Sequence, residues 1–207
     1  IDYFGAIKII KQLKEVLEER LGEPLLDGAV AIPPGIPERT ACSIANVAEG
    51  AGFEVTNIVD EPTAAAKVLG VRDGAVVDVG GGTTGISIIK DGNVIFTADE
   101  PTGGIHMTLT LAGYYGVTLE EAEVIKKDPE REDEIFPVIK PVVQKMASIV
   151  KRFIVGQEVE RIYVAGGASC FHEFEAVFEK EIGIETIKPN DALLVTPLGI
   201  AWSVRLS

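Results

Sequence analysis

Cysteine and histidine are scarce in this chain, with two of each among 207 residues. Cys42 and Cys170 are far apart and belong to no C-x-x-C or Cys/His pattern, which argues against a zinc site. Burial statistics predict that both are reduced core residues. His106 and His172 have no Ser or Cys nucleophile at a recognisable spacing, so we expect structural or exposed roles for them.

Long apolar runs and excess positive charge are also absent. No stretch of about 18 apolar residues occurs, and no basic region precedes an apolar run in residues 1–10. We therefore expect a cytoplasmic protein without a membrane span. The 32 acidic and 19 basic residues give a net charge of −13, which repels nucleic acid and anionic membranes. Hydrophobic residues make up 46% of the chain, enough for one large core or two small ones.

The first third of the chain alternates between helical and strand-like patterns. Apolar residues recur every three or four positions in the helical segments, while the strands are short apolar runs. This alternation predicts an α/β architecture with helices packed on a sheet. The predicted helices are residues 4–21, 39–51 and 64–69, and the predicted strands are residues 28–32 and 55–59.

The middle of the chain changes to an antiparallel pattern. Three strand-like runs, residues 75–79, 84–90 and 93–98, are joined by a glycine turn and by Asp91-Gly92, a typical two-residue hairpin turn. Pro141 is expected to bend a long helix or to mark its true start. The later predicted helices are residues 102–115, 118–127, 135–155, 171–181 and 193–202, with one strand at residues 161–165.

The strongest chemical signal is the sequence Val-Val-Asp-Val-Gly-Gly-Gly-Thr-Thr at residues 76–84. Glycines let backbone N–H groups approach an anion closely, so this turn is predicted to hold phosphate. Asp78 at the strand end would then hold Mg²⁺, mostly through water, because magnesium gives up its hydration reluctantly. A tight hairpin with a capping aspartate is the alternative interpretation.

Two weaker signals lie on either side. Gly166-Gly167-Ala168 follows a predicted strand and precedes a helix. A ribose or phosphate can approach such a turn, although close packing explains it equally well. Glu61 lies between a strand and a helix of small residues, where a carboxylate can orient a water for attack on a phosphoryl group. Its alternative role is a helix N-terminal charge.

In their order, these motifs resemble the ATPase superfamily of actin, DnaK and the sugar kinases. Residues 60–66 are similar to the first connecting helix of DnaK-type chaperones, residues 78–83 to the second phosphate loop, and Gly166-Gly167 to the adenosine motif. Three further segments, residues 3–6, 112–117 and 196–199, resemble the EutJ family of ethanolamine utilisation. The resemblance implies an α/β, actin-like ATPase (ribonuclease H-like) fold with two lobes around a nucleotide cleft. Residues 1–72 would belong to the first lobe and 73–207 to the second, with a small helical subdomain at 102–134.

The resemblance also implies a site for ATP or ADP with Mg²⁺. Glu61 is expected to orient the attacking water, Asp78 to serve Mg²⁺, and Glu123 and Lys126 to touch the ribose. The residues expected to contact the nucleotide are Gly80, Gly81, Gly82, Thr83, Thr84, Gly103, Gly104, Glu123, Lys126, Gly166, Gly167 and Ala168.

Three departures from the superfamily pattern weaken the expected catalysis, the likeness to DnaK and the expected affinity for purines. No Asp-x-Gly-Thr phosphate loop precedes Gly35, so the N-terminal β-hairpin is expected to be missing and turnover to be poor. Gly85 stands where DnaK-type chaperones have an aspartate. DnaK-type chaperones have an arginine that stacks on adenine, and in this sequence another residue takes its place near Cys170.

The resemblance implies a chaperone-like or reactivating ATP-binding protein of ethanolamine utilisation, in which slow hydrolysis drives lobe closure. Its protein client would be an ethanolamine-pathway enzyme or a component of a bacterial microcompartment. The alternatives are a filament-forming bacterial actin, a small-molecule kinase of the same superfamily, and a non-hydrolysing scaffold or adaptor of the microcompartment.

Overall fold

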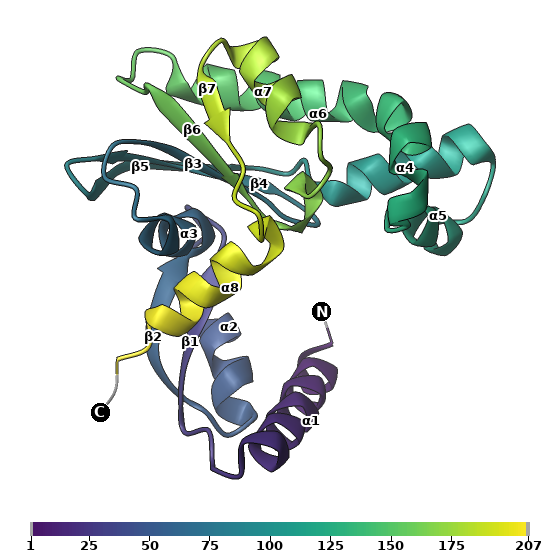
Figure 1. The fold of residues 1–207 in the computed structure, drawn as a ribbon. Coiled ribbons are helices and arrows are strands. Elements are labelled where there is room, and N and C mark those ends of the chain that lie inside the picture. Colours follow the sequence, from purple (N-terminus) through teal and green to yellow (C-terminus); the bar gives the residue numbers. More distant parts are fainter. Residues whose placement is uncertain (1, 206–207) are drawn as a thin grey trace.

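The structure is a computed structural model that describes residues 2–205. Its N-terminal part contains a two-stranded parallel sheet with three helices around it (Figure 1). These elements are α1 (Tyr3–Leu21), β1 (Asp27–Ile32), α2 (Glu38–Gly50), β2 (Glu54–Asp60) and α3 (Glu61–Leu69). All the helices and strands predicted for this region are therefore present, close to their expected bounds.

A five-stranded sheet forms the larger half of the molecule, with the strand order β5-β4-β3-β6-β7. The first three strands in sequence form the expected antiparallel meander, and the last two run parallel to β3. Asp91 and Gly92 join β4 to β5 with φ angles of 52° and 76°, as a tight hairpin turn requires. The strands are β3 (Gly74–Val79), β4 (Thr84–Lys90), β5 (Asn93–Glu100), β6 (Arg161–Ala165) and β7 (Glu185–Ile187).

Different helices cover the two faces of this sheet. Val77 of β3 faces the main core, to which α4, α6 and α7 contribute. Val76 faces a smaller cluster with Ala65 of α3 and Val195 of α8. Asp78 has the same parity as Val76, so its side chain points toward α3 and α8. The helices of this half are α4 (Gly104–Tyr115), α5 (Leu119–Lys126), α6 (Glu132–Ile154), α7 (Phe174–Ile182) and α8 (Ala192–Trp202), with 3₁₀ turns at Pro129–Arg131 and Gly167–Ser169.

Helices α3 and α8 lie between the two sheets and link the two halves of the molecule (Figure 1). They cross so closely that a Cβ atom on Gly199 would lie 2.0 Å from the carbonyl oxygen of Ala64. Only glycine permits this approach. The two sheets agree with a two-lobed fold, while a boundary between residues 72 and 73 stays a prediction.

Some predicted details of the second half are wrong. Pro141 lies inside α6, which begins at Glu132, so this proline does not mark the start of the helix, while the alternative that it bends the helix stays a prediction. Carboxylates in the first turn favour the earlier start because they interact well with the helix dipole. α7 begins at Phe174 instead of residue 171, since a 3₁₀ turn follows β6. β7 is absent from the prediction because three residues are too few to show a periodic pattern.

Cys42 and Cys170 are both exposed, which corrects the prediction that they are buried. Cys42 lies on the outer face of α2, whose buried side chains are Ala41, Ala45 and Ala48. Cys170 follows the 3₁₀ turn after β6. Burial statistics fail at these positions because the phase of a helix and the path of a turn decide which way each thiol points.

Candidate functional site

The N-terminus of α4 holds the glycine turn after β3 in place. The N–H of Gly104 donates to the carbonyl oxygen of Gly80 at 2.9 Å, and the N–H of Ile105 donates to that of Gly81 at 2.8 Å. Gly103 packs so tightly that a Cβ atom there would lie 2.8 Å from the oxygen of Gly80. A side chain at position 103 would therefore push the turn away from the helix.

The carbonyl oxygens of Gly80 and Gly81 are thus occupied, while the amide groups of Gly81 and Gly82 are free. Within residues 2–205, the N–H groups of Gly81 and Gly82 donate to no protein acceptor, and both residues are exposed. Thr83 is half-buried, and its carbonyl oxygen accepts from the N–H of Gly80 at 3.0 Å. Exposed amides beside a helix N-terminus form an anion-binding surface. This turn can therefore hold phosphate oxygens.

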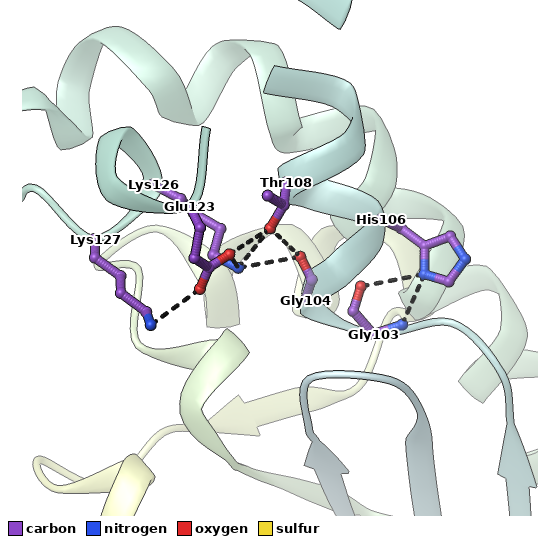
Figure 2. Close-up of polar contacts among 7 residues, drawn as sticks. All are labelled: Gly103, Gly104, His106, Thr108, Glu123, Lys126 and Lys127. Atoms are coloured by element: carbon purple, nitrogen blue, oxygen red, sulfur yellow. Dashed lines mark hydrogen bonds and ion pairs between the residues drawn. The ribbon is translucent and has the colours of Figure 1, made fainter. Parts of the chain in front are cut away.

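A cluster of polar side chains joins α4 to α5 (Figure 2). Glu123 Oε2 lies 2.6 Å from both Thr108 Oγ1 and Lys126 Nζ. Lys126 Nζ also donates to Thr108 Oγ1 at 2.8 Å and to the carbonyl oxygen of Gly104 at 3.2 Å. Lys127 Nζ lies 3.1 Å from the second carboxylate oxygen of Glu123. The cluster therefore ties α5 to the first turn of α4.

The charge of Glu123 follows from these contacts. Burial would raise the pKa of Glu123, but hydrogen bonds from Lys126 and Thr108 lower the pKa to about 2. Glu123 is thus ionised at neutral pH and holds Lys126 beside it. Thr108 and Lys127 also belong to this cluster, and the sequence prediction of the site names neither of them.

A cavity of about 550 Å³ connects the glycine turn, the α4–α5 cluster and the turn after β6. It has a charged wall at Glu123 and Lys126 and an apolar wall at Phe171 and Leu193. The predicted site residues that line it are Gly81, Gly104, Glu123, Lys126, Gly167 and Ala168. The lining residues absent from the prediction are Lys127, Asp128, Pro129, Glu132, Cys170, Phe171 and Leu193. Most of these follow a predicted motif directly, whereas no sequence signal indicates Leu193.

The two predicted catalytic carboxylates do not line this cavity. Asp78 lies at the end of β3 with 6% of its surface exposed, and its Oδ2 accepts from Thr196 Oγ1 at 2.5 Å. Burial raises the pKa of Asp78, against the effect of this hydrogen bond. Glu61 begins α3, and burial together with the charges of Asp78, Asp99 and Asp60 raises its pKa to about 7. Both carboxyl groups therefore hold protons more tightly than they would in water.

Other predicted site residues lie outside the cavity lining and contribute indirectly, through the backbone that they position. Thr84 is buried in β4, and its hydroxyl donates to the carbonyl oxygen of Thr102 at 2.5 Å. Gly166 has a φ of 89°, and a Cβ atom there would lie 2.3 Å from Asp78 Oδ1. These two residues, like Gly80, Gly82, Thr83 and Gly103, do not line the cavity. They position the strands and turns that do.

Both histidines have the structural or exposed roles that the sequence predicts. His106 Nδ1 accepts from the N–H of Gly103 at 3.1 Å and so caps α4 (Figure 2). His172 is exposed, with its Nδ1 2.8 Å from Glu132 Oε1.

The residues present fit a cation that keeps most of its water ligands better than a cation bound entirely by protein side chains. Within residues 2–205, no group of three or more His, Cys, Asp or Glu side chains is arranged to hold a metal ion. A Mg²⁺ ion at Asp78 would therefore take most of its ligands from water and phosphate, which is its usual mode of binding.

Nearly the whole chain matches a curated protein. Ethanolamine utilization protein EutJ of Salmonella typhimurium is 44% identical over 205 residues, which cover 99% of this chain and 72% of that protein. The chain belongs to the EutJ family. The crystal structure of EutJ from Carboxydothermus hydrogenoformans is 50% identical, with a TM-score of 0.91. That match covers 97% of this chain and 74% of the other.

Two further similarities concern the fold of this EutJ-family chain. The family model described as type IV pilus assembly protein PilM matches residues 62–195. MreB5 of Spiroplasma citri bound to ADP has a TM-score of 0.78 at 20% identity, covering 98% of this chain and 75% of its own. The predicted actin-like ATPase fold is therefore confirmed. Across residues 2–205, no helix combines the length and the apolar character needed to cross a membrane.

Proposed function

We propose that this EutJ-family chain binds ATP or ADP with Mg²⁺ at the cavity between the glycine turn and α5. The observation that supports this proposal is the meeting of three distant glycine motifs, represented by Gly81, Gly104 and Gly167, around one space of about 550 Å³. Ligand pockets commonly have volumes of about 300–1,000 Å³. MreB5 of Spiroplasma citri, which shares the fold, has been solved with ADP and with AMPPNP.

Along the cavity, the lining groups match the order of phosphate, ribose and base in a nucleotide. The free amides at Gly81 would bind phosphate oxygens, as oriented backbone N–H groups do elsewhere. Glu123 and Lys126 would hydrogen-bond the ribose hydroxyls, and Phe171 and Leu193 would contact the base. Mg²⁺ would supply charge neutralisation at the phosphates.

Hydrolysis in this proposal depends on Glu61. Its pKa of about 7 leaves part of the population ionised at neutral pH, and the ionised carboxylate can orient and deprotonate a water. Asp78 would hold the water shell of the cation near the turn. Turnover is expected to be slow, because few charged groups surround the phosphate end.

We further propose that nucleotide binding and slow hydrolysis close and open the cleft between the two halves, with α3 and α8 as the link. This motion would act on a protein client in a chaperone-like or reactivating role. The client would be an ethanolamine-pathway enzyme or a microcompartment component in the cytoplasm, since the curated relatives are named for ethanolamine utilization. Stimulation of hydrolysis by one such purified enzyme, and by no unrelated protein, tests this part.

A second candidate is a non-hydrolysing scaffold with the same fold. The observation that favours it is the burial of Asp78, whose carboxyl group is bonded to Thr196 and has a raised pKa. A protonated Asp78 would hold no cation. Nucleotide binding without measurable turnover would support this candidate.

Isothermal titration of Mg-ATP, Mg-ADP and Mg-GTP tests nucleotide binding. We expect the adenine nucleotides to bind, and Asp78→Asn to weaken them by roughly tenfold or more, as loss of one charged ligand does. Asp91→Asn is the matched control, because Asp91 is exposed in the β4–β5 turn and asparagine tolerates its positive φ. If the unmutated chain binds none of the three nucleotides, the proposal is wrong.

A further inference from the structure

A single side-chain hydrogen bond joins α8 to the end of β3. Thr196 Oγ1 donates to Asp78 Oδ2 at 2.5 Å across 118 positions of sequence, and both residues are buried. Within residues 2–205, no other side chain donates a hydrogen bond to this carboxylate. The orientation of the Asp78 side chain therefore depends on one hydroxyl of α8.

This use of a helical threonine differs from that of Thr110 on α4, whose hydroxyl donates to the carbonyl group of His106, four residues earlier in its own helix. That is a common bond for threonine inside a helix. Thr196 also lies inside its helix, yet its hydroxyl donates across to β3. Its bond therefore serves Asp78 and not the backbone of α8.

The backbone encloses the other side of the same carboxylate. A Cβ atom on Gly166 would lie 2.3 Å from Asp78 Oδ1, so the turn after β6 passes directly beside it. The N–H of Gly166 donates to the carbonyl oxygen of Ala192, at the start of α8, at 3.0 Å. The turn and the start of α8 are thus joined by a hydrogen bond beside Asp78.

We propose that Thr196 is a positioning residue that holds the Asp78 carboxylate in the orientation in which it receives the hydrated cation accompanying the nucleotide. This inference rests on the proposed nucleotide function and adds a residue that no motif indicates. Because α8 also crosses α3 at Gly199, the bond couples Asp78 to the helix pair that links the two halves. Without the hydroxyl, the buried carboxylate loses its one side-chain donor, which disfavours its charged and oriented form.

The test separates the cation-dependent part of nucleotide binding from the rest. Affinity for ADP is measured by calorimetry with Mg²⁺ and with a chelator, and the ratio of the two affinities is compared among variants. Thr196→Val has nearly the shape of threonine and no hydroxyl, while Thr196→Ser keeps the hydroxyl. Thr110→Val is the matched control, because the Thr110 hydroxyl donates only within α4.

The Mg²⁺ gain is the ratio of the ADP affinity with Mg²⁺ to the ADP affinity in chelator. We expect Thr196→Val to lower this gain by roughly tenfold, which is the usual effect of losing a hydrogen bond to a charged group. Its affinity for ADP in chelator should stay within about twofold of the unmutated value, since the ribose and base contacts are intact. Thr196→Ser should restore the gain, and Thr110→Val should leave it unchanged. In an Asp78→Asn background, Thr196→Val should have no further effect.

Several results would overturn the inference. A full Mg²⁺ gain in Thr196→Val, an equal loss of both affinities, or a failure of Thr196→Ser to restore the gain would each assign Thr196 a purely structural role. Nucleotide binding without any Mg²⁺ gain in the unmutated chain would contradict it as well. Absence of all nucleotide binding in the unmutated chain would instead reject the proposed function, and this inference with it. If Thr196→Val does not fold, Thr196→Ala, which removes the same hydroxyl and adds no bulk, is compared with Thr196→Ser under the same two conditions and decides the question.

Discussion

A Cβ atom on Gly85 would lie only 3.6 Å from Oδ1 of Asp99, the residue directly opposite on β5. Asp78 lies opposite Gly85 on β3, so the three positions form a row on one face of the sheet. Asp99 Oδ1 is buried and has no hydrogen-bond partner within residues 2–205. The glycine therefore separates two carboxyl groups at the position where DnaK-type chaperones have an aspartate.

Restoring that aspartate should destabilise this chain. Gly85→Asp places a third carboxylate beside Asp78 and Asp99, and we expect the free energy of unfolding to fall by about 2–4 kcal/mol at pH 7. Gly85→Ala is the control for volume. Its Cβ atom would meet Pro62 at 3.4 Å, an ordinary contact, so its loss should be about 1 kcal/mol or less. Urea denaturation of both variants measures the difference, and equal losses would show that packing, not charge, decides it.

The raised pKa of Glu61 predicts a pH dependence of stability. The folded chain raises this pKa from 4.5 to about 7, so it binds the proton more tightly than the unfolded chain does. The resulting stabilisation is complete below the unfolded pKa and is lost as the pH rises through about 7. Between about pH 5 and pH 8 the free energy of unfolding should therefore decline by about 1 kcal/mol, and Glu61→Gln should remove this decline. The figure is small because Glu61 is partly exposed to solvent.

Chemical denaturation at several pH values checks this decline. Glu49→Gln changes the charge of an exposed residue of α2 and should leave the pH profile as it is. An unchanged profile in Glu61→Gln would show that other groups cause the pH dependence.

Alanine should have opposite effects at two glycines of this segment, the crowded Gly103 and the open Gly113. Gly103→Ala brings a Cβ atom to 2.7 Å from backbone atoms of Gly82 and Thr83, so we expect a loss of about 2 kcal/mol and weaker nucleotide binding. Gly113→Ala lies in α4 with no atom within 4 Å and should stabilise the chain by about 0.5–1 kcal/mol. Thermal unfolding and calorimetry measure both effects. Similar behaviour of the two variants would contradict the assigned contact.

Loss of the Glu123 charge should affect the cavity more than the fold. Glu123→Gln removes the partner of Lys126 and a proposed ribose contact, so we expect nucleotide affinity to fall by roughly tenfold. Glu120→Gln makes the same change on the exposed side of α5 and should bind nucleotide normally. Comparison of ADP with 2′-deoxy-ADP sharpens the test. A variant that weakens both ligands by the same factor as it weakens inorganic phosphate would place Glu123 away from the ribose.

The site could be predicted where one short motif carries the chemistry. Gly81 and Gly167 come from two such motifs, the family resemblance implies Gly104, and all three line the cavity. Phe171 and Leu193 line it as well, but their positions depend on a 3₁₀ turn and on where α8 begins. No local pattern encodes that placement, because it results from packing between distant segments.

The sequence by itself determined the α/β order of elements, the antiparallel meander with its Asp91-Gly92 turn, and the family, since periodicity, turn residues and motif order are local properties. Only the tertiary structure decided that Thr196 donates to Asp78 and that Gly85 faces Asp99. It also decided that the cysteines are exposed. These outcomes follow from strand register, helix phase and the crossing of α3 and α8, which arise only when the segments pack together.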